Sequence, residues 1–231
     1  MKEFLIDSAA FGVVISLVAY QIGVFIRHKT GISLLSPLVT ATAIIIVFLV
    51  AMDIDYDTYN EGASFLRYFL TPATVCLAIP LYQKLQMLKE NFAAIIIGIL
   101  SGVLTSAVSI LALCILFDFE HEMYVTLLPK SVTTAIGIGV SEELGGTIAL
   151  TTAAIIIAGN VGGMFAEVIF KLFRIKEPIS KGLSLGNASH VMGTSRAIEI
   201  GETEGAMGSL AIAVAGIITV IVLPLFADFI V

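Results

Sequence analysis

The sequence predicts an all-α integral membrane protein with about six full transmembrane helices and two broken or re-entrant helical hairpins. Of its 231 residues, 58% are hydrophobic and only 13% are charged. A soluble domain carries about 25% charged residues, because it must cover its surface. The mean hydropathy of +1.04 is explained if lipid surrounds most side chains. Two segments rich in Gly, Ser and Thr are too polar to face lipid, and they predict the hairpins.

A helix needs about 20 apolar residues to cross a hydrocarbon layer of about 30 Å. Uninterrupted segments of this kind are Phe4–Ile26, Ser33–Met52, Phe92–Phe117, Thr147–Phe173 and Ala206–Ile230. The first is interpreted as a span and not as a signal peptide, because no small-residue cleavage site precedes Arg27. Phe65–Leu85 is a further span, interrupted by prolines. We expect helix breaks at Pro72 and Pro129.

Short loops that contain Lys and Arg lie on the inner side of the membrane, and this rule sets the orientation of the spans. The loops Asp53–Glu61 and Phe117–Met123 contain neither residue, and they are predicted outside. Lys171–Lys181 is the most basic loop and is predicted inside, as is Lys84–Lys89. This requires the segment from Tyr124 to Gly146 to enter and leave the membrane from the outside.

By the same reasoning, the segment from Gly182 to Thr203 enters and leaves from the inside. Two such hairpins would meet near the middle of the membrane, where transporter sites usually lie. A repeat at a spacing of 60 residues supports this arrangement: Thr134, Ile138, Glu142, Gly145 and Leu150 recur as Thr194, Ile198, Glu202, Gly205 and Leu210. Residues 124–173 and 182–230 are therefore a candidate inverted repeat within a single polytopic domain, residues 1–231.

The first hairpin contains the run Pro129-Lys130-Ser131-Val132-Thr133-Thr134. Proline prevents a helical turn from closing, so backbone groups and the hydroxyls of Ser131, Thr133 and Thr134 become available. Lys130 adds positive charge, and the combination suits a small anion. In the alternative, the hydroxyls bond back to their own helix and Lys130 extends to the membrane surface.

The second hairpin carries the candidate ligands Asn187, Ser189, His190, Thr194 and Arg196. Histidine titrates near physiological pH, and arginine can bind a carboxylate through two parallel hydrogen bonds. Ionisable residues at membrane depth are functional candidates by default. The alternative is an interfacial helix whose arginine pairs with a glutamate three residues later or with lipid headgroups.

Carboxylates near the hairpins are candidates for ion coupling. Glu142 and Glu202 could couple transport to protons or sodium together with His190, although solvated turn carboxylates are the alternative interpretation. Glu167 lies alone in an apolar span, so we expect it to be protonated or paired. Asp53, Asp55 and Asp57 are interpreted as an acidic external loop.

Composition and motifs also exclude several function classes. The formal net charge of −6 argues against nucleic-acid binding, which needs a basic surface. The sequence has no Gly-x-Ser-x-Gly elbow, no His-Glu-x-x-His helix, no Walker loop and no Cys-x-x-Cys pair. We therefore expect no enzyme activity, no cofactor and no metal. Cys76 and Cys114 lie in apolar segments and are interpreted as small hydrophobic residues.

At these same residues the sequence resembles the LrgB/CidB family over nearly the whole chain. The most specific stretches are Pro72 to Val75, Pro129 to Thr134, Ala188 to Arg196, and Glu204 to Ala206. The family usually shows Pro where Ala135 stands, Thr where Asn187 stands and Pro where Ile148 stands. These departures leave the charged residues intact.

The resemblance implies two competing functions. Members are described as holin- or antiholin-like proteins that act with a smaller LrgA/CidA-type membrane partner on murein hydrolase activity and lysis. A plastid relative exchanges glycolate and glycerate, and bacterial members are linked to pyruvate movement. We expect a multi-pass protein of the cell (inner) membrane that forms a homo-oligomer in the lipid bilayer.

Of these functions, a carrier for small monocarboxylates, proton-coupled or exchanging, is the main hypothesis. The alternative is a holin/antiholin-like regulator of murein hydrolase export and cell lysis. Lys130, His190 and Arg196 favour the carrier, because a lesion-forming holin needs no stereospecific anion site.

Overall fold

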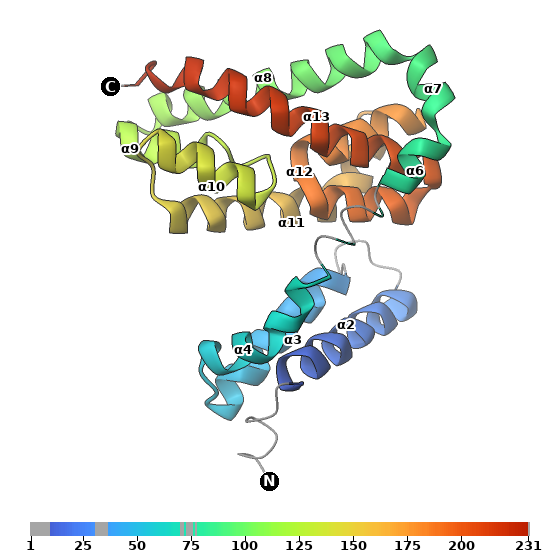
Figure 1. The fold of residues 1–231 in the computed structure, drawn as a ribbon, viewed down its shortest axis with the longest axis vertical. Coiled ribbons are helices and arrows are strands. Elements are labelled where there is room, and N and C mark those ends of the chain that lie inside the picture. Colours follow the sequence, from blue (N-terminus) through green and yellow to red (C-terminus); the bar gives the residue numbers. More distant parts are fainter. Residues whose placement is uncertain (1–9, 31–36, 70–71, 73–75, 77, 231) are drawn as a thin grey trace. The chain divides into compact units, whose positions relative to one another are not determined.

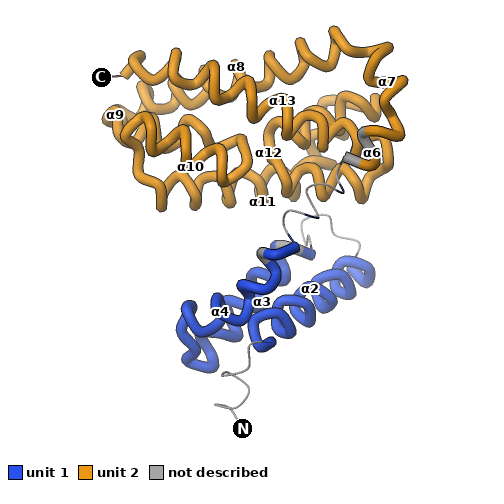
Figure 2. The backbone as a smooth tube through the Cα atoms, viewed as in Figure 1, with its two compact units in different colours: residues 1–76 blue, residues 77–231 orange. Residues whose placement is uncertain are grey.

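The computed structural model describes residues 10–30, 37–69, 72, 76 and 78–230. All regular secondary structure in these residues is helical (Figure 1). The chain divides into two compact units, Met1–Cys76 and Leu77–Val231 (Figure 2). The predicted all-α class is confirmed, whereas the single domain of residues 1–231 stays a prediction.

Four described helices are long and apolar enough to cross a membrane: α2 (Phe11–Thr30), α8 (Phe92–Leu116), α11 (Ile148–Leu172) and α13 (Glu202–Ala227). The helices α8 and α11 agree with the predicted spans to within one residue at each end. Helix α13 begins at Glu202 rather than at the predicted Ala206. Its first turn is acidic, and negative charge is favourable at a helix N-terminus.

The first unit contains α2, α3 (Pro37–Met52) and α4 (Tyr56–Arg67). Gly23 of α2 lies against the carbonyl of Pro37, and Ser16 Oγ lies 2.8 Å from the hydroxyl of Tyr59 in α4. Of the predicted spans Phe4–Ile26 and Ser33–Met52, residues 4–9 and 33–36 lie outside the described residues.

Helix α4 occupies part of the segment 53–61, which the sequence analysis interpreted as an acidic external loop, because the chain is helical from Tyr56 onward. Asp55 caps its N-terminus by accepting hydrogen bonds from the backbone N–H groups of Asp57 (2.8 Å) and Thr58 (3.2 Å). The hydroxyl of Thr58 donates a further bond, and this bond is the main reason that the pKa of Asp55 is lowered. The cap is therefore ionised at neutral pH, and its contribution to stability is lost only as the pH falls through the lowered value.

The predicted span Phe65–Leu85 is not one helix. Helix α4 ends at Arg67, Tyr68 and Phe69 form a turn, and Pro72 and Cys76 are again helical. The helices α6 (Ala78–Gln83) and α7 (Leu85–Glu90) follow. Pro72 is described and exposed, but residues 70–71 and 73–75 are not, so the break predicted there lies outside the described residues.

The first predicted hairpin consists of α9 (His121–Leu127) and α10 (Thr134–Glu143), joined by a turn at residues 128–133. Thr151 of α11 joins the two arms, because its hydroxyl donates to the carbonyl of Thr126 in α9 (2.9 Å) and lies 2.6 Å from the hydroxyl of Ser141 in α10. All three residues are buried. The arms therefore run side by side along α11, and the chain reverses at the turn that contains Pro129.

The second predicted hairpin is α12 (Pro178–Ile200), which reverses at His190. His190 has φ 41° and ψ −129°, a strained conformation for a residue with a side chain. A Cβ atom at Gly193 would overlap the carbonyl oxygen of Leu185, which is possible only if the second arm folds back onto the first. Gly186 of the first arm and Thr194 of the second both lie against Gly208 of α13.

The two hairpins have the same construction. In each, a helical arm, a reversal and a second arm are followed by a long helix, and the 60-residue spacing matches Lys130 with His190 at the two reversals. The contact of Thr126 with Thr151 has its counterpart in the contact of Gly186 with Ala211. Figure 1 shows α11 and α13 running in opposite directions, as an inverted repeat requires. The inverted repeat of residues 124–173 and 182–230 stays a prediction.

The hairpin tips lie at the middle of the long helices. His190 Nε2 lies 3.0 Å from the carbonyl of Ile155 in α11, and Ile155 also packs on Gly137 of the first hairpin. Pro129 and Asn187 line one small cavity together with Val103 of α8 and Thr219 of α13. Tips that enter from opposite ends therefore converge within the second unit.

The two ends of this unit differ in charge. One end holds the starts of α8, α12 and α13 and the end of α11, and Lys84 pairs there with Glu202 at 3.4 Å. It carries all Lys and Arg residues of the unit except Lys130 and Arg196: Lys84, Lys89, Lys171, Arg174, Lys176 and Lys181. The opposite end, where His121 contacts the carbonyl of Ile230, carries acidic residues and no described Lys or Arg.

Candidate functional site

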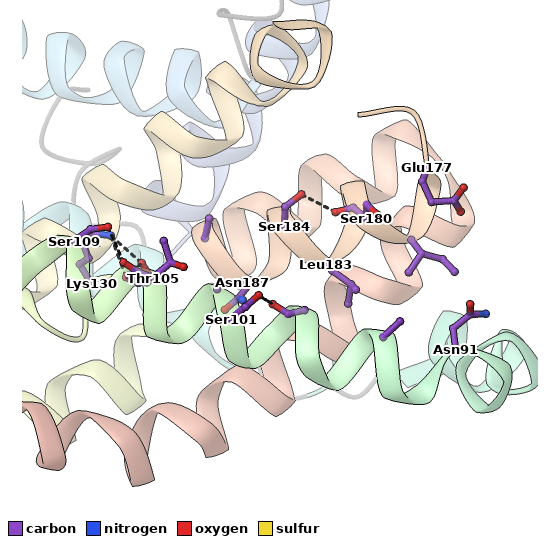
Figure 3. Close-up of a pocket in the computed structure, with 17 residues that line it drawn as sticks. Asn91, Ser101, Thr105, Ser109, Lys130, Glu177, Ser180, Leu183, Ser184 and Asn187 are labelled. Atoms are coloured by element: carbon purple, nitrogen blue, oxygen red, sulfur yellow. Dashed lines mark hydrogen bonds between the residues drawn. The ribbon is translucent and has the colours of Figure 1, made fainter. Parts of the chain in front are cut away.

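A cavity of about 680 Å³ lies between α8 and the first arm of α12 (Figure 3). Asn91 and Glu177 lie at one end of it, near the basic end of the unit, and Lys130 lies at the other. Hydroxyl groups line much of its length: Ser101, Thr105, Ser106, Ser109, Ser131, Ser180 and Ser184. This cavity is an open groove that runs from the basic end to the tip of the first hairpin, and hydroxyl groups interrupt its largely apolar wall.

The deep end of the cavity is organised around Lys130. Its ammonium group donates to the hydroxyl of Ser131 (2.9 Å) and to the hydroxyl of Ser106 on α8 (3.4 Å). The two hydroxyls lie 3.1 Å from each other. An ammonium group has three donors, so one donor is left for a ligand in the cavity.

Lys130 has no carboxylate partner within 4 Å in the described part of the chain. A cation held at depth by neutral hydroxyls is not neutralised by the protein. Coulombic attraction for an anion is stronger here than in water, because the effective dielectric constant is lower. The arrangement is suited to binding one negative charge.

Asn187 lines the cavity midway, at a close contact between α12 and α8. Its amide donates to the carbonyl of Ile99 at 2.9 Å, and a Cβ atom at Gly102 would overlap the amide nitrogen. Lys130, Ser131 and Asn187 are thus the predicted site residues that the structure brings to one cavity.

The other predicted ligands of the two hairpins do not line this cavity. Thr133 and Thr134 begin α10 and are partly buried. Ser189 is buried against Gly162 of α11. Thr194 is buried against α13, and its hydroxyl has no hydrogen-bond partner among the residues that the structure describes. His190 lies over Gly159, and its Nε2 must carry a proton, since a carbonyl oxygen such as that of Ile155 can only accept.

Arg196 forms ion pairs with Glu167 of α11 and with Glu199 of its own arm. The guanidinium is 8% exposed, whereas the two carboxylates are 37% and 39% exposed. The pairing joins the second arm of α12 to α11. Glu167, which lies alone in the sequence of its span, is therefore paired in the fold.

The coupling candidates Glu142 and Glu202 lie at opposite ends of the unit. Glu142 is exposed near the end of α10, and Glu202 is exposed at the start of α13, where it pairs with Lys84. Neither lines the cavity. In the described residues, no group of three or more His, Cys, Asp and Glu side chains could hold a metal ion.

The hydroxyls of α8 are site residues that were not predicted from the sequence. Ser101, Thr105 and Ser109 stand four residues apart, so they share one helix face, and all three line the cavity. The spacing was visible in the sequence, but the segment was interpreted only as an apolar span. The polar stripe is the signal that would have found it.

Comparison with known proteins places these features in a family. A family model described as the LrgB-like family matches residues 16–229. Similar proteins named "Antiholin-like protein LrgB" occur in Bacillus mycoides (strain KBAB4), Bacillus cereus (strain B4264) and Bacillus anthracis (strain CDC 684 / NRRL 3495). Each is 38% identical over 221 residues, which cover 95% of this chain and 96% of the relative. No solved structure matches the chain. The chain belongs to the LrgB-like family, and it is a multi-pass membrane protein.

Proposed function

We propose that this member of the LrgB-like family binds a small monocarboxylate at Lys130 and carries it across the membrane, and that this transport underlies an antiholin-like role. The names of the relatives support the antiholin-like role more directly than they support transport. The observation that carries the transport proposal is the cavity that ends at a lysine without a carboxylate partner in the described residues.

A transported anion must exchange its water shell for donors of the protein. An isolated ion in a medium of low dielectric constant costs tens of kcal/mol by Born estimates. The hydroxyls along α8 and the first arm of α12 offer successive hydrogen-bond partners, and Lys130 offers the charge at the end of the passage. A small acid such as glycolate, pyruvate or lactate carries one negative charge, which matches Lys130, the one cation among the described residues that line the cavity.

Coupling to a proton is assigned to His190. Its Nε2 is engaged with the carbonyl of Ile155, so Nδ1 is the nitrogen that would take up the proton. The residue stands at the reversal of the second hairpin, so its protonation would act on the backbone that positions Asn187. Glu142 and Glu202 are weaker candidates, since both are exposed at the ends of the unit.

The second candidate function is a holin/antiholin-like regulator of murein hydrolase export and lysis that acts with an LrgA/CidA-type partner. The printed names of the relatives favour it. In this case the protein would control a lesion as a homo-oligomer or with the partner, and the cavity would not need to recognise a particular anion. Both candidate functions place the protein in the inner membrane.

Counterflow in proteoliposomes distinguishes the two functions. Purified protein is reconstituted into vesicles loaded with unlabelled glycolate, pyruvate or lactate, and uptake of the labelled acid is followed, with protein-free vesicles as the control. A carrier gives uptake that saturates with concentration and overshoots when the vesicles are preloaded. Uptake that rises linearly with concentration and shows no overshoot would favour the lesion model.

A further inference from the structure

Two cavities meet at the middle of the second unit. The larger one runs from the basic end to Lys130, and the smaller one, of about 10 Å³, lies between Pro129, Val132 and Thr219. Ser106, Ser131 and Asn187 line both. The smaller cavity, here called the inner chamber, has room for about one water molecule. The two spaces are therefore neighbours that share one wall.

Asn187 is the residue of this wall whose side chain reaches from one helix to the backbone of another. Ser106 belongs to α8, and Ser131 belongs to the turn that also carries Lys130. The Asn187 amide, by contrast, reaches across from α12 and donates to the carbonyl of Ile99, one turn from Gly102. The absence of a side chain at Gly102 is what admits the amide, since a Cβ atom there would overlap it.

The far side of the inner chamber is closed by apolar residues. Leu128 and Leu223 line the chamber and belong to a buried cluster with Ile110, Cys114 and Tyr124. The hydroxyl of Tyr124 donates to the carbonyl of Phe226 in α13 at 2.7 Å. Seen from the large cavity, the inner chamber therefore lies behind Ser106, Ser131 and Asn187, and the apolar cluster lies behind the chamber.

We propose that Asn187 is the inner gate of the passage: its amide, held on α8 by Ile99 and Gly102, separates the large cavity from the inner chamber and decides what enters it. The role of Asn187 as a gate rests on the proposed transport function. The contact of its amide with α8 belongs to the fold and can be tested without transport. Asn187 stands three residues before the reversal at His190, so a shift of the hairpin tip moves the amide away from α8. Passage then requires loss of the bond to Ile99.

The gate is tested by the accessibility of a cysteine in the inner chamber, which needs no transport. Cys76 and Cys114 are replaced by Ala, and Thr219→Cys is introduced as the reporter, since Thr219 is buried and lines the inner chamber. A small methanethiosulfonate reagent is applied to vesicles from the side of the basic end. The labelling rate of the cysteine is measured, and size-exclusion chromatography confirms folding.

Two variants disrupt the contact of the Asn187 amide with α8, one on each helix. Asn187→Ala removes the amide, and Gly102→Ala displaces it. Each is expected to speed labelling by roughly five- to tenfold, because loss of one net hydrogen bond shifts an opening equilibrium by about that factor. The matched control is Gly98→Ala, one turn earlier on α8, where a Cβ atom meets only Leu183 at 3.8 Å. Its labelling rate should equal that of the parent.

Unchanged labelling in folded Asn187→Ala protein overturns the gate, as does equal acceleration by Gly98→Ala and Gly102→Ala. If Asn187→Ala does not fold, Asn187→Thr, which is shorter and keeps a polar group, takes its place with the same expectation. The labelling result is independent of counterflow, so failure of the gate and failure of the transport proposal are read separately.

Discussion

At the scale of single residues, the surroundings of two hairpin cations assign them different roles. Arg196 lies between the carboxylates of Glu167 and Glu199, so its charge is neutralised within the protein. Lys130 contacts only hydroxyls in the described residues, so its charge is available to a ligand. Removing a partner of Arg196 should affect stability, whereas removing Lys130 should affect binding.

Glu167→Gln tests the role of Arg196. Loss of the carboxylate leaves a buried guanidinium with one fewer partner, but Glu167 is about one-third exposed and solvent screens the pair. We expect a loss of about 1–2 kcal/mol in the free energy of unfolding, measured by denaturant titration in detergent. The control is Glu202→Gln, which removes the exposed partner of Lys84 and should cost less than about 1 kcal/mol. A larger loss for Glu202→Gln than for Glu167→Gln would contradict this assignment.

The sequence predicted some site residues and could not predict others. Lys130, Ser131 and Asn187 stood out because polar groups clustered where apolar residues were expected. The pairing of Arg196 with Glu167 was not predictable, because the two lie 29 residues apart on different helices and only the fold joins them. Ser189 and Thr194 are hydroxyl residues like those that line the cavity, but their side chains lie against α11 and α13. The residue type alone does not tell which neighbouring helix a side chain faces.

At the scale of elements, charge and composition predicted the two hairpins. The sequence marks the residue at which the chain reverses in the first hairpin but not in the second. Pro129 marks the first reversal by its chemistry. The second occurs at His190, where neither Gly nor Pro stands, and the strained φ of 41° is imposed by packing. Helix α4 was missed because its N-cap, Asp55, was interpreted as part of an acidic loop.

Gly193→Ala tests whether α12 is a folded hairpin. A Cβ atom at this position would overlap the carbonyl of Leu185 in the other arm, so the arms must separate. We expect a loss of about 1–3 kcal/mol of stability, seen as a lower midpoint in thermal unfolding followed by size-exclusion chromatography. Gly139→Ala is the control, since a Cβ atom there meets nothing within 4 Å and alanine favours helix by up to about 1 kcal/mol. A continuous α12 would tolerate both substitutions.

At the scale of the whole molecule, the separation of charge within Leu77–Val231 predicts its orientation. Residues 84–89 and 171–181 lie at the same, basic end, and residues 117–123 lie at the other. The positive-inside rule places the basic end in the cytoplasm. Single cysteines at residues 84–89 and 171–181 should resist an impermeant thiol reagent added outside intact cells, and cysteines at residues 117–123 should react. Labelling of residues 171–181 from the outside would contradict this orientation, and labelling of both 171–181 and 117–123 from the outside would exclude the double-hairpin topology.

The central claim is that Lys130 holds the transported anion, and counterflow of labelled glycolate in proteoliposomes tests it most directly. Loss of a charge-assisted hydrogen bond costs about 1.5–3 kcal/mol, so Lys130→Ala should weaken apparent affinity by roughly 10- to 150-fold while the protein still inserts and folds. Lys130→Arg should restore it only in part, because a planar guanidinium does not match the position of an ammonium between Ser106 and Ser131. Wild-type counterflow in folded Lys130→Ala protein would contradict the claim.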